Sequence, residues 1–167
     1  FDFKEMVEAR NSESLVAEAS FTKTIETALA NDTPISEAMP LPALYKIAEE
    51  NFWDGEKIES LLNVYKQAEL TQTFTKNYKK MSIDDLTTTI NDYKKVYEAL
   101  DQTNTEDQLK GLALQDSITT LEDRSQALKN IIGNANPYKV LGTDGIIDFN
   151  NINETTATEL KNRRITT

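Results

Sequence analysis

The chain has 167 residues, contains neither cysteine nor histidine, and carries a formal net charge of -10. The missing residue types exclude thiol catalysis, disulfides, Cys/His zinc sites and any catalytic triad built on histidine. The acidity is concentrated in residues 1–60, which hold thirteen acidic and five basic residues and so argue against nucleic acid or an anionic membrane as a partner. No run of 18 apolar residues occurs, so the sequence predicts no membrane insertion, and no motif calls for a cofactor or a metal.

The first 30 residues are predicted to form two helical segments, residues 2–10 and a second helix from Ser12 or Ser14 to about Ala30, which can be continuous. The side chains expected on the packing faces are Phe3, Met6, Val7 and Arg10 in the first segment and Leu15, Ala19, Thr22, Ile25 and Leu29 in the second. We expect residues 1–30 to act as a semi-independent N-terminal helical arm. Within it, Phe3 and Val7 are predicted to lie in a partner interface.

Three prolines between residues 31 and 42 break the helical pattern. A short helix is predicted over residues 43–51, followed by Phe52 and Trp53, the only tryptophan of the chain. We interpret Trp53 as an anchor that pins this segment to the core rather than as a platform for a ligand. The next helix is predicted from near residue 54 to about residue 79. Its expected apolar face consists of Ile58, Leu61, Leu62, Tyr65 and Ala68.

The most informative segment is residues 82–133, where two helices carry apolar or small residues at alternating spacings of three and four. The first seam is Ile83, Leu86, Ile90, Tyr93, Tyr97 and Leu100, and the second is Gly111, Leu114, Ile118, Leu121, Ser125, Leu128 and Ile132. Heptad seams joined by a short polar loop predict an antiparallel pair of helices. Ser82 is expected to cap the first helix, and residues 105–108 have the capping-box pattern for the second. Leu109 and Leu112 lie off the seam, so we expect them to contact a third helix or a partner.

The pattern changes after residue 133. A small β-hairpin is predicted near residues 138–149, followed by a short C-terminal helix, so that residues 134–167 form a C-terminal appendage. The segment 144–149 is similar to the second half of an EF-hand calcium loop, but the first, third and twelfth ligands of that loop are missing. Only Asp144 and Asp148 match, so a turn followed by a strand is favoured and no metal site is predicted.

Together these elements predict a mainly α protein, a helical bundle built around the antiparallel hairpin of residues 82–133 and folded as a single domain of residues 1–167. The heptad seams, the off-seam leucines and the lack of catalytic residue types favour a non-enzymatic structural or assembly protein. We expect it to bind protein subunits, either copies of itself or others, as part of an oligomer or a larger assembly. The composition, rich in Asn, Thr and Lys, is of the kind found in phage virion or secreted filament components, which makes a virion or secreted location the expectation.

Two alternative functions stay open. The first is an acidic inhibitor or nucleic-acid mimic, which would use the acidic N-terminal third to occupy a basic partner surface. The second is a carboxylate-only hydrolase, because paired carboxylates can hydrolyse glycosides. The candidate acids are Glu49, Glu50, Asp54, Glu56 and Glu59. Acids at a helix start are stabilising in any case, so a solvated surface is the favoured interpretation of this cluster.

Overall fold

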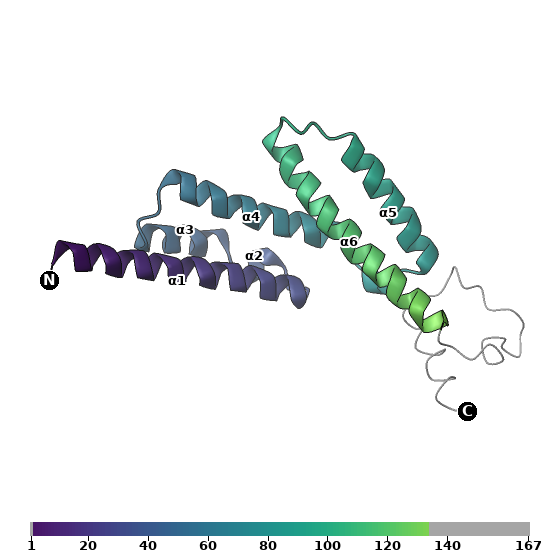
Figure 1. Cartoon of the computed structure of the whole chain (residues 1–167), viewed down its shortest axis with the longest axis horizontal. Helices are drawn as coiled ribbons and strands as arrows, with labels where there is room; N and C mark the ends of the chain where they lie inside the picture. The colour runs from purple at the N-terminus through teal and green to yellow at the C-terminus, as the bar shows by residue number, and fades with distance from the viewer. Residues whose placement is uncertain (1, 134–167) are drawn as a thin grey trace, which may run out of the picture. The chain divides into compact units, whose positions relative to one another are not determined.

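The computed structural model describes residues 2–133, which fold almost entirely into helices (Figure 1). The elements are α1 (Phe3–Ala30), α2 (Ile35–Ala38), α3 (Leu41–Glu50), α4 (Gly55–Phe74), the 3-10 helix η1 (Tyr78–Lys80), α5 (Ile83–Glu98) and α6 (Thr105–Gly133). Across residues 2–133 there is no strand, so this part of the protein is mainly α, as predicted. The β-hairpin predicted near residues 138–149, the C-terminal helix and the appendage of residues 134–167 all lie outside the described residues.

The chain divides into two compact units, the first ending at Thr73 and the second beginning at Phe74. Each unit has an apolar cluster of its own. The expectations of a single domain over residues 1–167 and of a semi-independent arm over residues 1–30 stay predictions.

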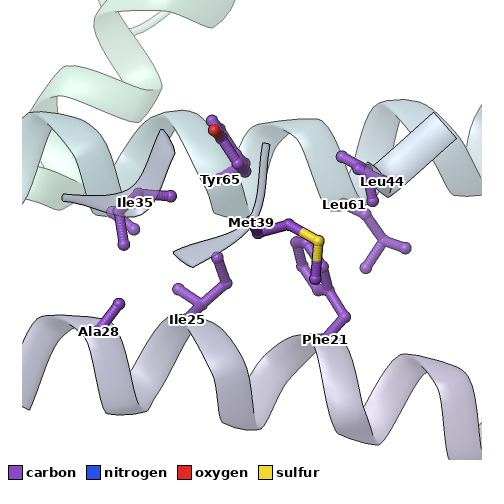
Figure 2. Packing of buried hydrophobic residues seen from close by; sticks show 9 residues of the cluster. Phe21, Ile25, Ala28, Ile35, Met39, Leu44, Leu61 and Tyr65 are labelled. Atoms are coloured by element: carbon purple, nitrogen blue, oxygen red, sulfur yellow. The ribbon is translucent and has the colours of Figure 1, made fainter. Parts of the chain in front are cut away.

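The first unit is built around apolar side chains that α1, α2, α3 and α4 turn toward one another (Figure 2). The buried members of this cluster are Phe21, Ile25, Ala28, Ile35, Met39, Leu44, Leu61, Tyr65 and Ala68. Burying each large apolar side chain of this kind contributes about 1.5–3 kcal/mol to stability. The cluster therefore accounts for the association of four helices, of which α2 is too short to be stable alone.

α1 is one continuous helix, and its buried face differs from the predicted one. Leu15 is 67% exposed, and Ala19 and Thr22 are exposed as well. The buried positions are Phe21, Ile25 and Ala28. The predicted face and the observed buried face share Ile25. The face with Phe21 is the buried one because burying this aromatic ring removes more apolar area from water than burying Ala19 or Thr22.

The turn after α1 is held by backbone and side-chain hydrogen bonds. Asp32 adopts the left-handed backbone conformation with a φ of 54°, and the N–H of Thr33 donates to the carbonyl of Ala28 at 2.9 Å, which is the Schellman pattern of a helix end. The side chain of Gln72 in α4 accepts from the N–H of Ile35 at 3.1 Å and donates to the carbonyl of Thr33 at 2.6 Å. These bonds fix the course of the chain between α1 and α2.

α3 and α4 differ from the predictions at their ends. α3 starts two residues before the predicted range of 43–51, with Pro42 in its first turn, where a missing N–H costs nothing. α4 ends at Phe74 rather than near Lys79, because Asn77 takes the left-handed conformation, with a φ of 61°, and η1 follows. The predicted face of α4 is confirmed for Leu61, Tyr65 and Ala68. Trp53 packs against the core cluster, which confirms its interpretation as an anchor.

In the second unit, α5 and α6 lie side by side in antiparallel directions (Figure 1). The predicted seam positions that are buried are Ile83, Leu86, Ile90, Gly111, Leu114, Leu121, Ser125 and Leu128. A Cβ added to Gly111 would lie 3.4 Å from the ring of Tyr97, so a small residue faces a large one at this layer. Tyr93 is half-buried, and its hydroxyl donates to the carbonyl of Phe74 at 2.6 Å. A regular coiled-coil geometry for this pair stays a prediction.

The two helices of this pair begin with different caps. Ser82 caps α5 through its hydroxyl oxygen, as predicted. The capping box predicted for the start of α6 does not form. Asn104 is the cap instead, its Oδ1 accepting from the N–H of Glu106 at 2.8 Å, and the side chain of Gln108 donates to the carbonyl of Gln102 at 2.7 Å. Asn is a stronger cap than Thr. The side chain of Gln108 binds the carbonyl of Gln102 in the loop and so does not complete a capping box with Thr105.

Candidate functional site

The face of α1 that is buried in the core continues past the core toward the N-terminus. The successive gaps between Phe3, Val7, Arg10 and Phe21 are four, three and eleven residues. Each gap is close to a whole number of helical turns, so the four residues lie on the same side of the helix. All residues from 2 to 13 are exposed, Phe3 at 78% and Val7 at 40%. In Figure 1 this part of α1 extends past α3 and α4 of the same unit. We refer to residues 3–13 as the α1 extension.

Two polar contacts set the direction of the α1 extension by holding α1 against the start of α4 and the connection before it. The indole Nε1 of Trp53 donates to the hydroxyl of Ser14 at 2.7 Å. One turn further along α1, the ammonium group of Lys57 donates to the carboxylate of Glu18 at 2.5 Å. Both charged side chains are about two-thirds covered, so this pair is less screened by water than a fully exposed one.

A third contact lies one turn before Ser14, where the guanidinium carbon of Arg10 is 4.8 Å from the centroid of the Phe52 ring. This is within the range of a cation–π interaction, which contributes about 0.5–1 kcal/mol at an exposed site. Arg10, Ser14 and Glu18 are spaced by four, so the three contacts follow one another along one side of α1. The row of contacts thus reaches into the α1 extension at Arg10, and residues 3–9 continue beyond it.

Phe52 occupies an unfavourable backbone position at the end of α3. Its φ is 56°, and the N–H groups of Phe52 and Trp53 donate to the carbonyls of Glu49 and Ala48 at 3.2 and 3.0 Å. This is a Schellman motif with Phe at the left-handed position, where glycine is the usual residue. The ring itself is 73% exposed, so core packing does not explain the choice of residue. An exposed aromatic side chain on a disfavoured backbone makes Phe52 a candidate for a functional surface.

The charge around the α1 extension is predominantly negative. Its acidic residues, together with the cap, are Asp2, Glu5, Glu8 and Glu13, and all four are exposed. The bases are Lys4 and Arg10, of which Arg10 lies on the apolar face. The first 60 residues carry a net charge of -8, with thirteen acids and five bases, so the negative field extends over the first unit.

Of the four predicted interface residues, two lie in the first unit and two in the second. Phe3 and Val7 lie on the exposed face of the α1 extension in the first unit. Leu109 and Leu112 belong to α6 in the second unit, where Leu109 is half-buried and Leu112 is 48% exposed. Sequence reasoning did not single out Phe52, although an aromatic residue just after a helix end, where glycine is usual, is a signal that could have drawn attention to it.

The acidic cluster near Trp53 has structural roles. Asp54 accepts from the N–H of Lys57 at 2.8 Å and thereby caps the start of α4, and Glu50 lies 4.0 Å from Lys46 in an exposed i,i+4 pair. Within residues 2–133, no three acidic side chains come close enough together to hold a metal ion. These contacts give Asp54 and Glu50 structural roles at helix ends and on a helix surface.

A shallow groove of about 310 Å³ lies between α5 and α6 in the second unit. It is lined by Lys94, Tyr97, Glu98, Gln115, Ile118 and Thr119. The Tyr97 hydroxyl already accepts a hydrogen bond from the side chain of Gln115 at 2.8 Å, and Lys94 lies 3.3 Å from Glu122. Tyr97, Gln115 and Lys94 therefore already have partners on the protein, and the groove is a weaker candidate for a site than the α1 extension.

Comparison of the chain with protein-family models, with curated proteins and with solved structures gives no match in any of the three. Among residues 2–133, no helix combines the length and the apolar character needed to cross a membrane. The function is therefore inferred from the side chains of α1 and of the connection between α3 and α4.

Proposed function

We propose that this chain is a non-enzymatic assembly protein that binds other protein subunits through the exposed face of the α1 extension. The observation that carries the proposal is that one continuous side of α1 buries Phe21 and Ile25 in the core and then presents Phe3 and Val7 to water. Apolar side chains arranged in a row along a helix are a recurrent means of binding a second protein. The composition favours a virion or a secreted assembly as the setting.

The row of contacts at Arg10, Ser14 and Glu18 supports this role. It ties α1 to the rest of the first unit up to the base of the extension, so the extension starts from a fixed direction. A helix that is already formed and oriented loses less conformational entropy on binding than a disordered segment. Covering the side chains of Phe3 and Val7 would then contribute about 1.5–3 kcal/mol each.

A second candidate function, an acidic inhibitor or nucleic-acid mimic, is favoured by the net charge of -8 in residues 1–60. In that case the charged surface of the first unit would bind a basic groove, and the apolar face would matter less. Binding of this kind weakens strongly as salt is raised. Salt dependence therefore separates the two candidates.

The test uses the full chain and two double variants as baits for proteins from the cells that produce it. Phe3→Asp/Val7→Asp charges the proposed face, whereas Leu15→Asp/Val16→Asp adds the same charge to two exposed apolar residues of α1 that lie off this face. We expect the wild type and the Leu15/Val16 variant to retain the same proteins and the Phe3/Val7 variant to lose them. Light scattering of each purified chain shows whether a lost partner is another copy.

Equal retention by all three baits would contradict the proposal. Loss of the retained proteins from all three baits in high salt would favour the acidic-inhibitor candidate instead.

A further inference from the structure

We propose that the α1 extension inserts as a helix into an apolar groove on a different protein and that the rim of this groove is basic. This inference rests on the proposed function and specifies the partner. The apolar face of the extension carries Phe3, Met6, Val7 and Arg10 at positions i, i+3, i+4 and i+7. This is the spacing by which an amphipathic helix anchors itself in a groove.

The exposure of the extension suits a groove that encloses it. Residues 2–13 are exposed on every side of the helix, and Figure 1 shows the extension reaching beyond α3 and α4. A groove can therefore surround several faces of residues 3–9, which precede the contact of Arg10 with Phe52. The ring of Phe52, beside Arg10, would then lie at the mouth of the groove, where the base of the extension enters.

The apolar area argues against a second copy of this chain as the occupant of this face. An aromatic side chain buries about 150–250 Å² when fully covered, and Met and Val bury less, so the exposed parts of Phe3, Met6, Val7 and Phe52 amount to an area on the order of 400 Å². A stable interface between two proteins buries about 800 Å² on each partner, counting polar and apolar surface together, so this face supplies about half of that area. Two extensions packed face to face would fall short of this area, whereas a groove adds contacts along the flanks of the helix.

The charge of the extension indicates what borders the groove. Outside the apolar face, the first 13 residues carry Asp2, Glu5, Glu8 and Glu13 against one lysine, Lys4. Two copies would approach with like charges, whereas lysine or arginine residues along a groove would complement these acids. Complementary charges at a rim steer association and set the orientation of a bound helix.

A photo-crosslinking experiment with the full chain tests the mode of binding. The photoreactive residue p-benzoylphenylalanine replaces Val7 in one chain and Leu15, which is exposed but lies outside the apolar face of the extension, in the control chain. We expect crosslinks from position 7 and none from position 15. The crosslinked peptides should belong to a different protein and carry lysine or arginine beside apolar residues.

A charge-reversal pair tests the basic rim. Glu5→Lys/Glu8→Lys changes the charge of the extension, and Glu26→Lys/Glu59→Lys makes the same change at exposed positions elsewhere in the first unit. We expect loss of capture at low salt for the first variant and retention for the second. Equal loss from both variants would assign the effect to the overall field and overturn the basic rim.

The outcomes also separate this inference from the proposed function. If capture does not depend on Phe3 and Val7, the proposed function itself is wrong. If capture does depend on them but position 7 crosslinks to another copy of the chain, to an acidic surface or to nothing, helix insertion into a basic-rimmed groove is overturned and the proposed function stands.

Discussion

The indole nitrogen of Trp53 and the hydroxyl of Ser14 are joined by a hydrogen bond of 2.7 Å across 39 positions of the sequence. Because Trp53 also packs against the core of the first unit, this bond links α1 to the core at the base of the α1 extension. The same region includes the Arg10–Phe52 contact and the ion pair between Lys57 and Glu18.

Replacing Ser14 by Ala should lower the free energy of unfolding by about 1 kcal/mol, because the half-buried indole N–H loses its acceptor. Ser12→Ala is the matched control, since Ser12 is exposed in the same helix and gains the same helix propensity on substitution. Trp53 is the only tryptophan, so urea unfolding followed by its fluorescence measures both variants. Identical midpoints for the two variants would show that the hydrogen bond contributes nothing.

Substitutions at Phe52 should separate two contributions to the free energy of unfolding, the strain of its left-handed backbone and the contact of its ring with Arg10. Phe52→Ala and Phe52→Gly both remove the ring from Arg10, but only glycine is relaxed at a φ of 56°. We expect the glycine variant to be more stable than the alanine variant by about 1 kcal/mol. The comparison is made by thermal unfolding followed by circular dichroism, and an alanine variant as stable as the glycine variant would disprove backbone strain at this position.

Gly111 lies inside α6 with enough room for a methyl group and for little more. An added Cβ would lie 3.4 Å from side-chain atoms of both Leu100 and Tyr97, which is ordinary contact. Gly111→Ala should therefore raise the free energy of unfolding by about 0.5–1 kcal/mol through helix propensity. Gly111→Leu should lower it by about 1–3 kcal/mol, because the larger side chain overfills the layer.

Urea unfolding of the two Gly111 variants and of the wild type measures these changes. A destabilised alanine variant would mean that the packing of α5 on α6 is tighter at this layer than the structure indicates.

Tyr93 should make the second unit sensitive to alkaline pH. Burial raises the pKa of its hydroxyl above the ordinary value of 10.0, and this hydroxyl donates to the carbonyl of Phe74. Because the folded state holds the proton more tightly than the unfolded state, this contribution to stability is complete below pH 10 and is lost as the pH rises through the raised pKa.

The comparison with Tyr93→Phe tests this pH dependence. At pH 7 the variant should be less stable than the wild type by about 1 kcal/mol, because the Phe74 carbonyl loses its donor. As the pH is raised above 10, the difference in urea midpoint should shrink. Two midpoint curves that stay parallel up to pH 11 would show that Tyr93 is not the group responsible.

The helix pair of the second unit could be predicted in some detail because its signals are local and consistent. The seams of α5 and α6 each repeat at spacings of three and four residues, and Ser82 caps the start of α5. The cap of α6 was predicted less well, since Thr105 and Asn104 are adjacent candidates and only the backbone geometry selects Asn104.

The candidate site was predicted only in part. The sequence placed Phe3, Val7 and Arg10 on one face, because that placement depends on helical spacing alone. The association of Arg10 with Phe52 and of Ser14 with Trp53 could not be predicted, because each contact joins residues about 40 positions apart. No pattern among neighbouring residues predicts such a contact.

The sequence by itself determined the helical character of residues 2–133, the turn at the prolines before α3 and the pairing of α5 with α6, since periodicity, caps and breakers act over a few residues. The tertiary structure decided which side of α1 is buried. Two faces of that helix carry apolar residues, and only packing against α2, α3 and α4 selects the one with Phe21 over the one with Leu15. The same choice leaves Phe3 and Val7 exposed, because α1 continues beyond the helices that cover its core.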